Sequence, residues 1–417
     1  MTSKLPLVII LGATGSGKTK LSLELARKFG GQIISADSMQ IYKGLDIITA
    51  KATVEERQMA PHHLIDELHP SQSCSVVDFR NRALSIIDNL FAKNILPIVV
   101  GGTNYYIESL LWRILVEEPG AWIEQNSPFE TSQLSNSELH KLLLEQDPDR
   151  ANKLHPNDRR KVLSSLEILH RKGRKHSDIL LEQQTSEGGS AFGGSLRFKN
   201  ALIFWMICEQ ATLDGRLDSR VDQMIEQGLV NELLDFHRRY NEQRVQNQLV
   251  DYTKGIFQSI GFKEFHKYLM LNPEGRASEI GRQIFATAVE DLKRVTRRYA
   301  KKQRRWIVNR LLSMSSNREV PPVYSLDTTD VDRWDECVTQ PSVSIVQSFI
   351  ESARCPYAPL AKQETLGLPI SMAEKHFCNS CERIFIGKFQ WTCHIKSRRH
   401  RRLAQKKSKE VKVECQT

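Results

Sequence analysis

A glycine-rich segment near the start of the chain has the residue types and spacing that bind phosphate. Residues 12–19 fit the pattern G-x-x-x-x-G-K-[ST] at every fixed position. Glycines let the backbone N–H groups of such a loop face one point, and the N-terminus of a following helix adds partial positive charge there. Lys18 can neutralise phosphate oxygens, and the Thr19 hydroxyl can bind Mg²⁺. The segment predicts a site for a diphosphate or triphosphate without distinguishing between them.

The elements around this loop have the patterns that the chemistry needs. Residues 7–11 are apolar and rich in β-branched side chains, as in a buried strand, and residues 20–29 have helical apolar spacing. A strand over 33–35 leads directly to Asp37, and another over 95–100 leads through two glycines to Thr103. In a parallel sheet, ligands bind outside the carboxyl ends of the strands, so both side chains belong beside the phosphate loop.

The chemistry of these two residues has alternatives. Asp37 could bind Mg²⁺ through water, act as a general base, or cap a helix. Thr103 could contact a leaving phosphate or an acceptor, or lie in an ordinary turn. Residues 216–221 begin a helix that we expect to run to about 239. An arginine there could clamp a pyrophosphate through two hydrogen bonds, or pair with Asp218 or Asp222 on the helix surface.

The sequence predicts an α/β fold with a parallel-sheet core around the phosphate loop. An apolar strand over 201–207 returns the chain to the sheet after a stretch of helical segments with no strong strand. Residues rich in Ser, Pro and Thr, with weak periodicity, follow a long amphipathic helix. The expected parts are the first part of the core (1–112), an inserted helical subdomain (113–199), the second part of the core with a basic helix (200–310), a linker (311–372), a zinc finger (373–405) and a basic tail (406–417).

The last module has the spacing of metal ligands. Cys378-x₂-Cys381-x₁₂-His394-x₅-His400 fits a two-Cys, two-His zinc finger, in which Zn²⁺ has a closed, structural coordination. Phe385 and Phe389 could supply its small core, with four arginines around His400. Such a site does not by itself indicate DNA or RNA.

Charge is unevenly distributed along the 417 residues, whose net charge is +10. Residues 281–310 hold ten Lys/Arg against two acids, and residues 375–412 hold twelve against two. These segments contribute +18, so the rest of the chain carries −8. Two basic surfaces on an acidic body indicate that a polyanion is bound at defined places, although two solvated helices would give the same counts.

Composition limits the class and location of the protein. With 40% hydrophobic and 26% charged residues, the chain can bury a full core. No apolar run approaches the roughly 20 residues of a membrane span. Eight cysteines do not make a disulfide scaffold, which indicates a reducing compartment. A strand within the first ten residues leaves no room for a targeting peptide. We expect a cytoplasmic monomer without a membrane partner, and leave a mitochondrial or nuclear fraction open.

Taken together, these motifs resemble those of the tRNA dimethylallyltransferases, also called tRNA isopentenyltransferases. The resemblance covers about residues 1–310 and is carried by the phosphate loop, Asp37-Ser38-Met39-Gln40, Gly101-Gly102-Thr103, the basic helix, and segments 155–158 and 256–264. The finger is similar to that of eukaryotic members.

The resemblance implies a reaction in which a dimethylallyl group moves from dimethylallyl diphosphate to N6 of adenosine 37 of tRNA. An adenine in a stacked loop cannot reach a buried diphosphate, so it should be flipped out. Implied catalytic residues are Asp37, Thr103 and Arg220. The diphosphate would bind Thr14, Gly15, Ser16, Gly17, Lys18 and Thr19, the last with Mg²⁺. The tRNA would contact Asp37, Ser38, Met39, Gln40, Arg160, Lys161, Arg294, Arg298 and Lys301, and Zn²⁺ would bind Cys378, Cys381, His394 and His400.

Two other classes share part of this pattern. One is a small-molecule enzyme, either a kinase or an isopentenyltransferase acting on free adenine nucleotides. The basic helix, the inserted subdomain and the finger argue against it, because a small acceptor needs none of them. The other is a non-catalytic nucleic-acid-binding protein, against which the intact loop with Asp37 and Thr103 argues.

Overall fold

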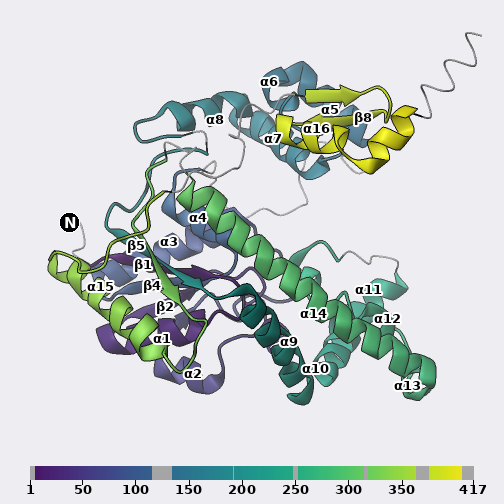
Figure 1. The fold of residues 1–417 in the computed structure, drawn as a ribbon. Helices are drawn as coiled ribbons and strands as arrows, with labels where there is room; N and C mark the ends of the chain where they lie inside the picture. The colour runs from purple at the N-terminus through teal and green to yellow at the C-terminus, as the bar shows by residue number, and fades with distance from the viewer. Residues whose placement is uncertain are drawn as a thin grey trace, which may run out of the picture. The chain divides into compact units, whose positions relative to one another are not determined.

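A parallel sheet forms the centre of the first of two structural units (Figure 1). The computed structural model describes residues 5–114, 134–190, 192–247, 252–313, 318–362 and 375–405. The six strands found in these residues have the order β3-β2-β4-β1-β5-β6, and every neighbouring pair is parallel. They are β1 Leu7–Gly12, β2 Gln32–Ser35, β3 His62–His63, β4 Pro97–Gly101, β5 Ala201–Ile207 and β6 Val323–Asp327.

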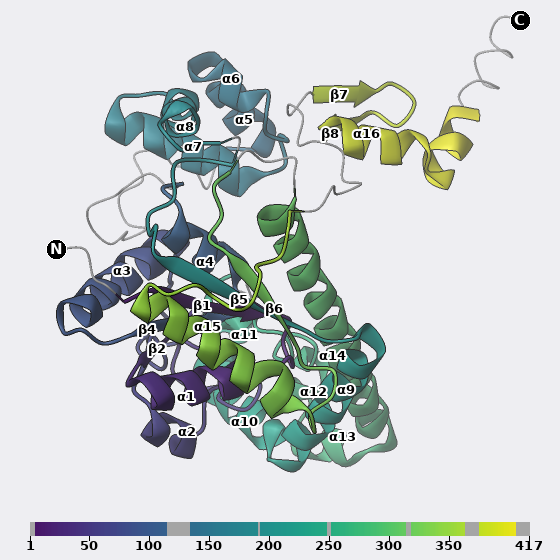
Figure 2. The ribbon, with the colours of Figure 1, turned by 60° about the vertical axis from the view of Figure 1, so that its left-hand side comes forward.

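The central strand β1 is buried on both faces, which explains its continuous apolar sequence. Leu7, Ile9 and Leu11 lie in one core, and Val8 and Ile10 lie in the other. Helices α3 (Val76–Ala92) and α4 (Asn104–Leu111) cover the first face, while α1 (Lys18–Phe29) and α15 (Gln340–Glu351) cover the second (Figure 2). The predicted strand–loop–helix around residues 12–19 is therefore present.

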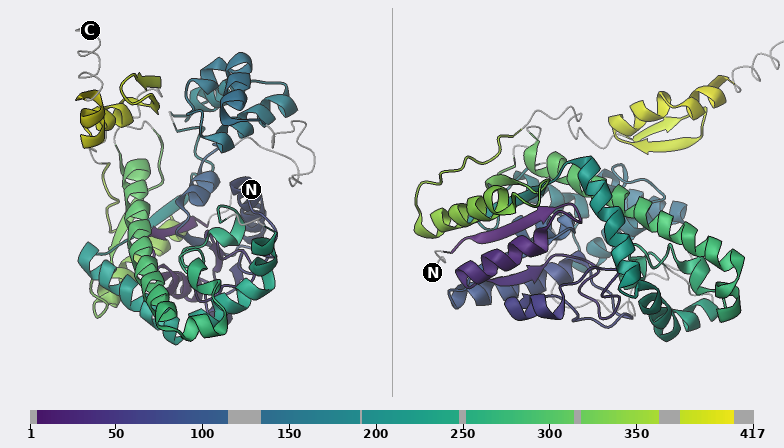
Figure 3. Two further views of the ribbon diagram at one scale, coloured as in Figure 1. Left: turned by 90° about the vertical axis from the view of Figure 1, so that its right-hand side faces the viewer. Right: turned by 60° about the horizontal axis from the view of Figure 1, so that its bottom comes forward.

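A third core lies beside the sheet and is crossed by the 29-residue helix α14, Glu279–Ile307 (Figure 3). The single helix expected from 216 to 239 is instead α9 (Gln210–Glu226) and α10 (Leu229–Phe236), because Gly228 turns left-handed, with φ of 98°. The other helices of this unit are α2 Val54–Met59, α11 Glu242–Gln246, α12 His266–Leu269 and α13 Pro273–Ala277, with π-helical turns His237–Asn241, Val308–Leu312 and Asp335–Thr339 and a 3₁₀ turn Gly255–Gln258.

The predicted linker over 311–372 is wrong for most of its described length. Strand β6 extends the sheet by pairing with β5, in the register Ile203 to Val323, and α15 packs beside α1. Strand β6 is only five residues long, and α15 contains three serines and a proline, so their local patterns are weak. They are stabilised by pairing and burial against distant parts of the chain. The first unit therefore extends to residue 362 rather than 310, and residues 363–372 lie outside the described part.

The second unit contains the inserted helices and the finger. The inserted helices are α5 Asn136–Gln146, α6 Pro148–Ala151, α7 Arg159–Lys172 and α8 His176–Thr185. They have a small core of their own, which includes Leu139, Leu143, Val162 and Leu166. Asp158 caps α7, and its side chain accepts from Lys161 N. Residues 115–133 of the predicted insertion (113–199) and the basic tail, 406–417, lie outside the described residues.

The finger has a two-stranded antiparallel hairpin followed by a helix, shown in yellow in Figure 3. The hairpin consists of β7 (Lys375–Cys378) and β8 (Arg383–Ile386), and the helix is α16 (Lys388–Ile395). Phe385 stacks on His394 with ring centroids 4.0 Å apart, as expected of a small core residue. The side chain of Phe389, the other predicted core residue, lies outside the described part. None of the described helices is both long enough and apolar enough to cross a membrane.

Candidate active site

The phosphate loop takes its shape from two glycines in the left-handed region. Gly15 has φ of 80° and Gly17 has φ of 83°, conformations that side chains strongly disfavour. Ser16 Oγ donates to Ala13 O at 2.8 Å within the loop. Lys18 Nζ donates back to the carbonyl oxygens of Gly12 (3.1 Å) and Ala13 (2.8 Å). The ammonium therefore lies over the loop, at one wall of a cavity of about 720 Å³.

Four charged residues line this cavity: Lys18, Asp37, Arg216 and Arg220. Burial lowers the pKa of Lys18 to about 8, while the Asp37 carboxylate opposes that shift. Burial also raises the pKa of Asp37, against the backbone N–H of Met39 and the charges of Lys18 and Arg220. With the carboxylate ionised, the lining holds three cations and one anion, so the cavity favours an anionic ligand.

Asp37 and Thr103 lie at neighbouring strand ends, as the sequence predicts. Asp37 Oδ1 accepts from Met39 N at 2.9 Å, so it caps a turn, and no helix of the described chain begins there. Thr103 Oγ1 accepts from Ser38 N at 3.0 Å and donates to Ser38 Oγ at 3.2 Å. A Cβ on Gly101 would lie 2.2 Å from Ala36 O, so glycine is required for this approach. The hydroxyl of Thr103 thus ties the ends of β2 and β4 together.

The side chain of Gln40 makes hydrogen bonds to other residues of the protein. Its Nε2 donates to Thr49 O (3.1 Å) and Ala50 O (3.0 Å), and its Oε1 accepts from Ser35 Oγ (2.9 Å). The loop that it holds is fixed further by Glu232, whose carboxylate accepts from two backbone N–H groups at residues 47 and 48. This arrangement favours a supporting role for Gln40 over direct contact with a base.

Two site residues of α14 were missed by the sequence analysis. Gln303 is almost fully buried; its Oε1 accepts from Thr14 N at 2.9 Å and its Nε2 donates to Gly102 O at 2.9 Å. Tyr299 OH also donates to Gly102 O, at 3.4 Å, and burial raises its pKa. One feature of the sequence could have indicated Gln303. Residues 295, 299 and 303 are spaced four apart, so they share the packing face of an amphipathic helix, where a polar glutamine is unusual.

A second cavity, of about 490 Å³, shares Thr14, Asp37, Arg220 and Tyr299 with the first. Segment 258–260 and the start of the 37–50 loop line it, together with a basic edge from α14. Its apolar wall is formed by Leu217, Val221, Met224, Ile260, Leu292 and Val295. The two cavities place an anion-binding region next to a partly apolar one, with Asp37 at both.

The basic helix α14 has two rows of cations with different partners. Three of them pair with an acidic row on α9: Lys293 with Asp222 at 2.7 Å, Lys301 with Asp214 at 3.1 Å, and Arg297 with Asp218. Arg294 pairs with Asp291 at 2.6 Å. Arg298 and Lys302 have no ion pair among the described residues, and both line the second cavity.

The ion pairs of α9 bear on one of the two alternatives for its arginines. Asp218 and Asp222 pair with α14 rather than with Arg216. Arg216 donates instead to the carbonyl oxygens of Thr328 (2.6 Å) and Thr329 (2.7 Å), beyond β6. Arg220 contacts the phosphate loop through Thr14 Oγ1 at 3.4 Å. In the inserted subdomain, Arg160 and Lys161 are exposed at the start of α7, and Lys161 pairs with Asp158 at 2.8 Å.

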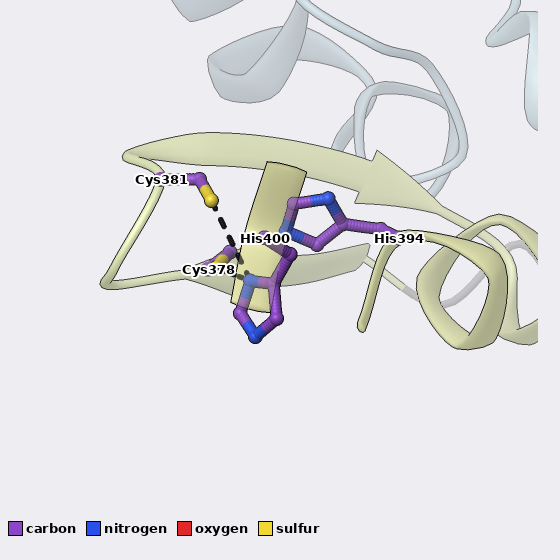
Figure 4. Close-up of side chains that lie close together, drawn as sticks. All are labelled: Cys378, Cys381, His394 and His400. Atoms are coloured by element: carbon purple, nitrogen blue, oxygen red, sulfur yellow. Dashed lines mark hydrogen bonds between the residues drawn. The ribbon is translucent and has the colours of Figure 1, made fainter. Parts of the chain in front are cut away.

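The four predicted zinc ligands converge in the finger (Figure 4). One ligand atom from each of Cys378, Cys381, His394 and His400 lies within 4.8 Å of the others. His400 Nδ1 is 3.5 Å from both sulfur atoms. His394 Nε2 is buried without a hydrogen-bond partner among the described residues. Two sulfurs and two imidazoles at this spacing are compatible with tetrahedral zinc.

Comparisons with known proteins show which proteins this chain is similar to. Residues 40–310 match the family model of IPP transferase, and residues 5–70 match that of isopentenyl transferase. The chain is 48% identical to tRNA dimethylallyltransferase of Homo sapiens over 95% of this chain and 85% of that one. For the Saccharomyces cerevisiae tRNA dimethylallyltransferase the identity is 31%, over 94% and 91%. A solved eukaryotic dimethylallyltransferase acting on tRNA superposes with a TM-score of 0.81 at 30% identity, covering 98% and 99%.

Proposed function

We propose the details of the reaction from one premise: the chain belongs to the tRNA dimethylallyltransferase family and transfers a dimethylallyl group to tRNA. The donor in this proposal is dimethylallyl diphosphate, with its diphosphate in the loop of residues 14–19. The supporting observation is that Lys18 and Arg220 line one cavity with this loop. Thr19, whose side chain is exposed at the first turn of α1, would hold Mg²⁺, which supplies countercharge to the diphosphate.

The acceptor is N6 of adenosine 37, flipped out of the anticodon loop. The N6 lone pair forms a bond to C1 of the dimethylallyl group, the C1–O bond breaks, and diphosphate leaves with the bonding electrons. Asp37 accepts the proton that N6 loses. Lys18, Arg220 and the loop N–H groups stabilise the negative charge that grows on the leaving group. Thr103, which is fixed between two strand ends, orients the amine or the diphosphate.

A labelled donor tests this assignment. Labelled dimethylallyl diphosphate should transfer label to tRNA with adenosine at position 37, and not to the same tRNA with guanosine there or to AMP. Label on AMP at a comparable rate would favour the isopentenyltransferases that act on free nucleotides. Label on the guanosine variant would refute the position and the acceptor atom.

The tRNA backbone is bound, in this proposal, by α14 together with exposed cations of α7, among them Arg160 and Lys161. On α14 the proposed residues are Arg294, Arg298 and Lys301, and we add Lys302 because it lines the second cavity beside Arg298. Of these, Arg298 and Lys302 have no acidic partner among the described residues, so phosphate has no competitor there. Binding through Arg294 or Lys301 would require an existing ion pair to open. We therefore expect Arg298 and Lys302 to contribute most of the salt-dependent affinity of the helix.

Replacing both Arg298 and Lys302 with alanine should reduce the slope of log affinity against log salt for tRNA. Each lost phosphate contact removes about 0.7 to 0.9 from this slope, so the pair should remove about 1.4 to 1.8. Arg27→Ala/Lys28→Ala is the matched control, because it removes the same charge from the exposed last turn of α1. Equal slopes in the two double variants, measured by filter binding, would contradict the assignment.

The finger, in this proposal, binds structural Zn²⁺ and adds phosphate contacts without taking part in the transfer. Since the first unit extends to residue 362, a chain cut near residue 370 should still transfer the group at saturating tRNA. We expect weaker tRNA binding and a flatter salt plot, because the tail loses twelve Lys/Arg. The choice of adenosine should persist, since phosphate contacts carry little sequence information.

The measurement for the finger is tRNA binding across a salt series, with zinc content determined in each protein. Cys378→Ser/Cys381→Ser in the full chain separates the metal from the charge, because it removes two zinc ligands and keeps every cation. Such fingers unfold without metal, so this variant should resemble the cut chain. Equal affinities and slopes in all three proteins would show that the finger does not bind tRNA.

A further inference from the structure

Trp334 lies in the region that the sequence analysis assigned to a linker, yet it packs on the phosphate loop. Its ring is 6% exposed, and a Cβ built on Gly17 would lie 2.6 Å from the ring's Cη2 atom. The flat ring therefore covers Gly17 on the side where any other residue would carry its side chain. Lys20 Nζ, three residues further on, lies 4.3 Å from the centroid of the same ring, within reach of a cation–π interaction.

The indole is also anchored to the helix that follows the loop. Trp334 Nε1 donates to both carboxylate oxygens of Glu24 on α1, at 3.0 and 3.1 Å. Thr339 Oγ1 donates to the same carboxylate at 2.9 Å. Hydrogen bonds to a carboxylate are stronger than neutral ones. Three hydrogen bonds thus connect the segment 334–339 to Glu24 of α1, while the Trp334 ring packs on Gly17 of the loop.

We infer that Trp334 is a positioning residue for diphosphate binding, which holds Gly17 and the start of α1 in the conformation that presents their N–H groups. The inference rests on the proposed binding of diphosphate by residues 14–19. Glycine can adopt several backbone conformations, and Gly17 is left-handed here. The Trp334 ring packed against it restricts the other backbone conformations. The ring does not line either cavity at the site, so it acts through the loop rather than by touching the substrate.

The test compares Trp334→Leu, Trp334→Phe and Phe349→Ala with the wild type, using inorganic pyrophosphate as the probe. Leucine keeps apolar bulk without a flat ring, and phenylalanine keeps a ring without the indole N–H. Phe349 is the control, because it is a ring of the following helix α15 that packs on Tyr324. Calorimetry gives the Kd for pyrophosphate, and circular dichroism at low temperature confirms that each variant is folded.

We expect Trp334→Leu to weaken pyrophosphate binding about tenfold or more and Trp334→Phe to weaken it less. Phe349→Ala should lower the melting temperature and leave this Kd unchanged. In steady-state assays Trp334→Leu should raise KM for dimethylallyl diphosphate and leave KM for tRNA near the wild-type value. A wild-type chain that fails to bind pyrophosphate would overturn the diphosphate assignment itself. Binding by the wild type with an unchanged Kd in folded Trp334→Leu, or the same loss in Phe349→Ala, would overturn the role of Trp334 alone.

Discussion

Replacing Asp37 with asparagine should reduce the rate of transfer by roughly two or more orders of magnitude, the range for loss of general base catalysis. Asparagine has the same size, and its Oδ1 can still accept from the N–H of Met39, so the turn should persist. The variant loses the ability to accept the N6 proton. The measurement is the single-turnover rate with tRNA prebound, and tRNA affinity should change little. A near-normal rate would refute the assignment of Asp37 as the base.

The same residue should determine the acid side of the pH–rate profile. Burial raises the pKa of Asp37, and a base must be deprotonated to act, so the rate falls as pH drops below this raised pKa. The fall in kcat/KM should therefore occur at higher pH than for an ordinary aspartate. The residual activity of Asp37→Asn should lack this limb. A limb that persists unchanged in the variant would assign it to another group.

Lys18→Ala should raise KM for dimethylallyl diphosphate by about ten- to a hundredfold, because hydrogen bonds to charged groups each contribute about 1.5–3 kcal/mol. Lys28→Ala, at the exposed end of the same helix, is the control. Affinity for tRNA should stay near the wild-type value, since the loop binds the donor.

The pH dependence of donor binding provides a second measurement on Lys18. Its pKa of about 8 means that the ammonium is charged below pH 8 and increasingly neutral above it. An anion binds the charged form, so donor binding by the wild type should weaken as pH rises through this range, and binding by Lys18→Ala should not. An effect of the substitution on ATP affinity alone, without an effect on transfer, would instead favour the kinase alternative.

Local sequence determined the parts of the site whose residues are close together in the chain. The phosphate loop, with its strand and helix, follows from eight consecutive residues and the apolar pattern on each side. Asp37 and Thr103 could be placed at one edge because parallel strands end there together. The four finger ligands follow from spacing within 23 residues, since a closed tetrahedral site restricts the ligand types and intervals. The family, and the transfer of a dimethylallyl group to tRNA that these motifs imply, are confirmed by the comparisons.

The tertiary structure alone decided which distant residues complete the site. Gln303 binds the loop across 289 positions of sequence, and its side chain alone does not distinguish a ligand of the loop from a surface residue. Strand β6 and Trp334 lie in a segment with a weak local pattern. Strand β6 is stabilised by pairing with β5, and Trp334 by packing on Gly17, so local propensity does not predict either of them. The sequence does not distinguish among the lysines and arginines of α14. In the structure, an acidic row on α9 forms ion pairs with Lys293, Arg297 and Lys301, and not with Arg298 or Lys302. Local patterns record what a segment can form, whereas contacts between distant segments depend on which surfaces the fold brings together.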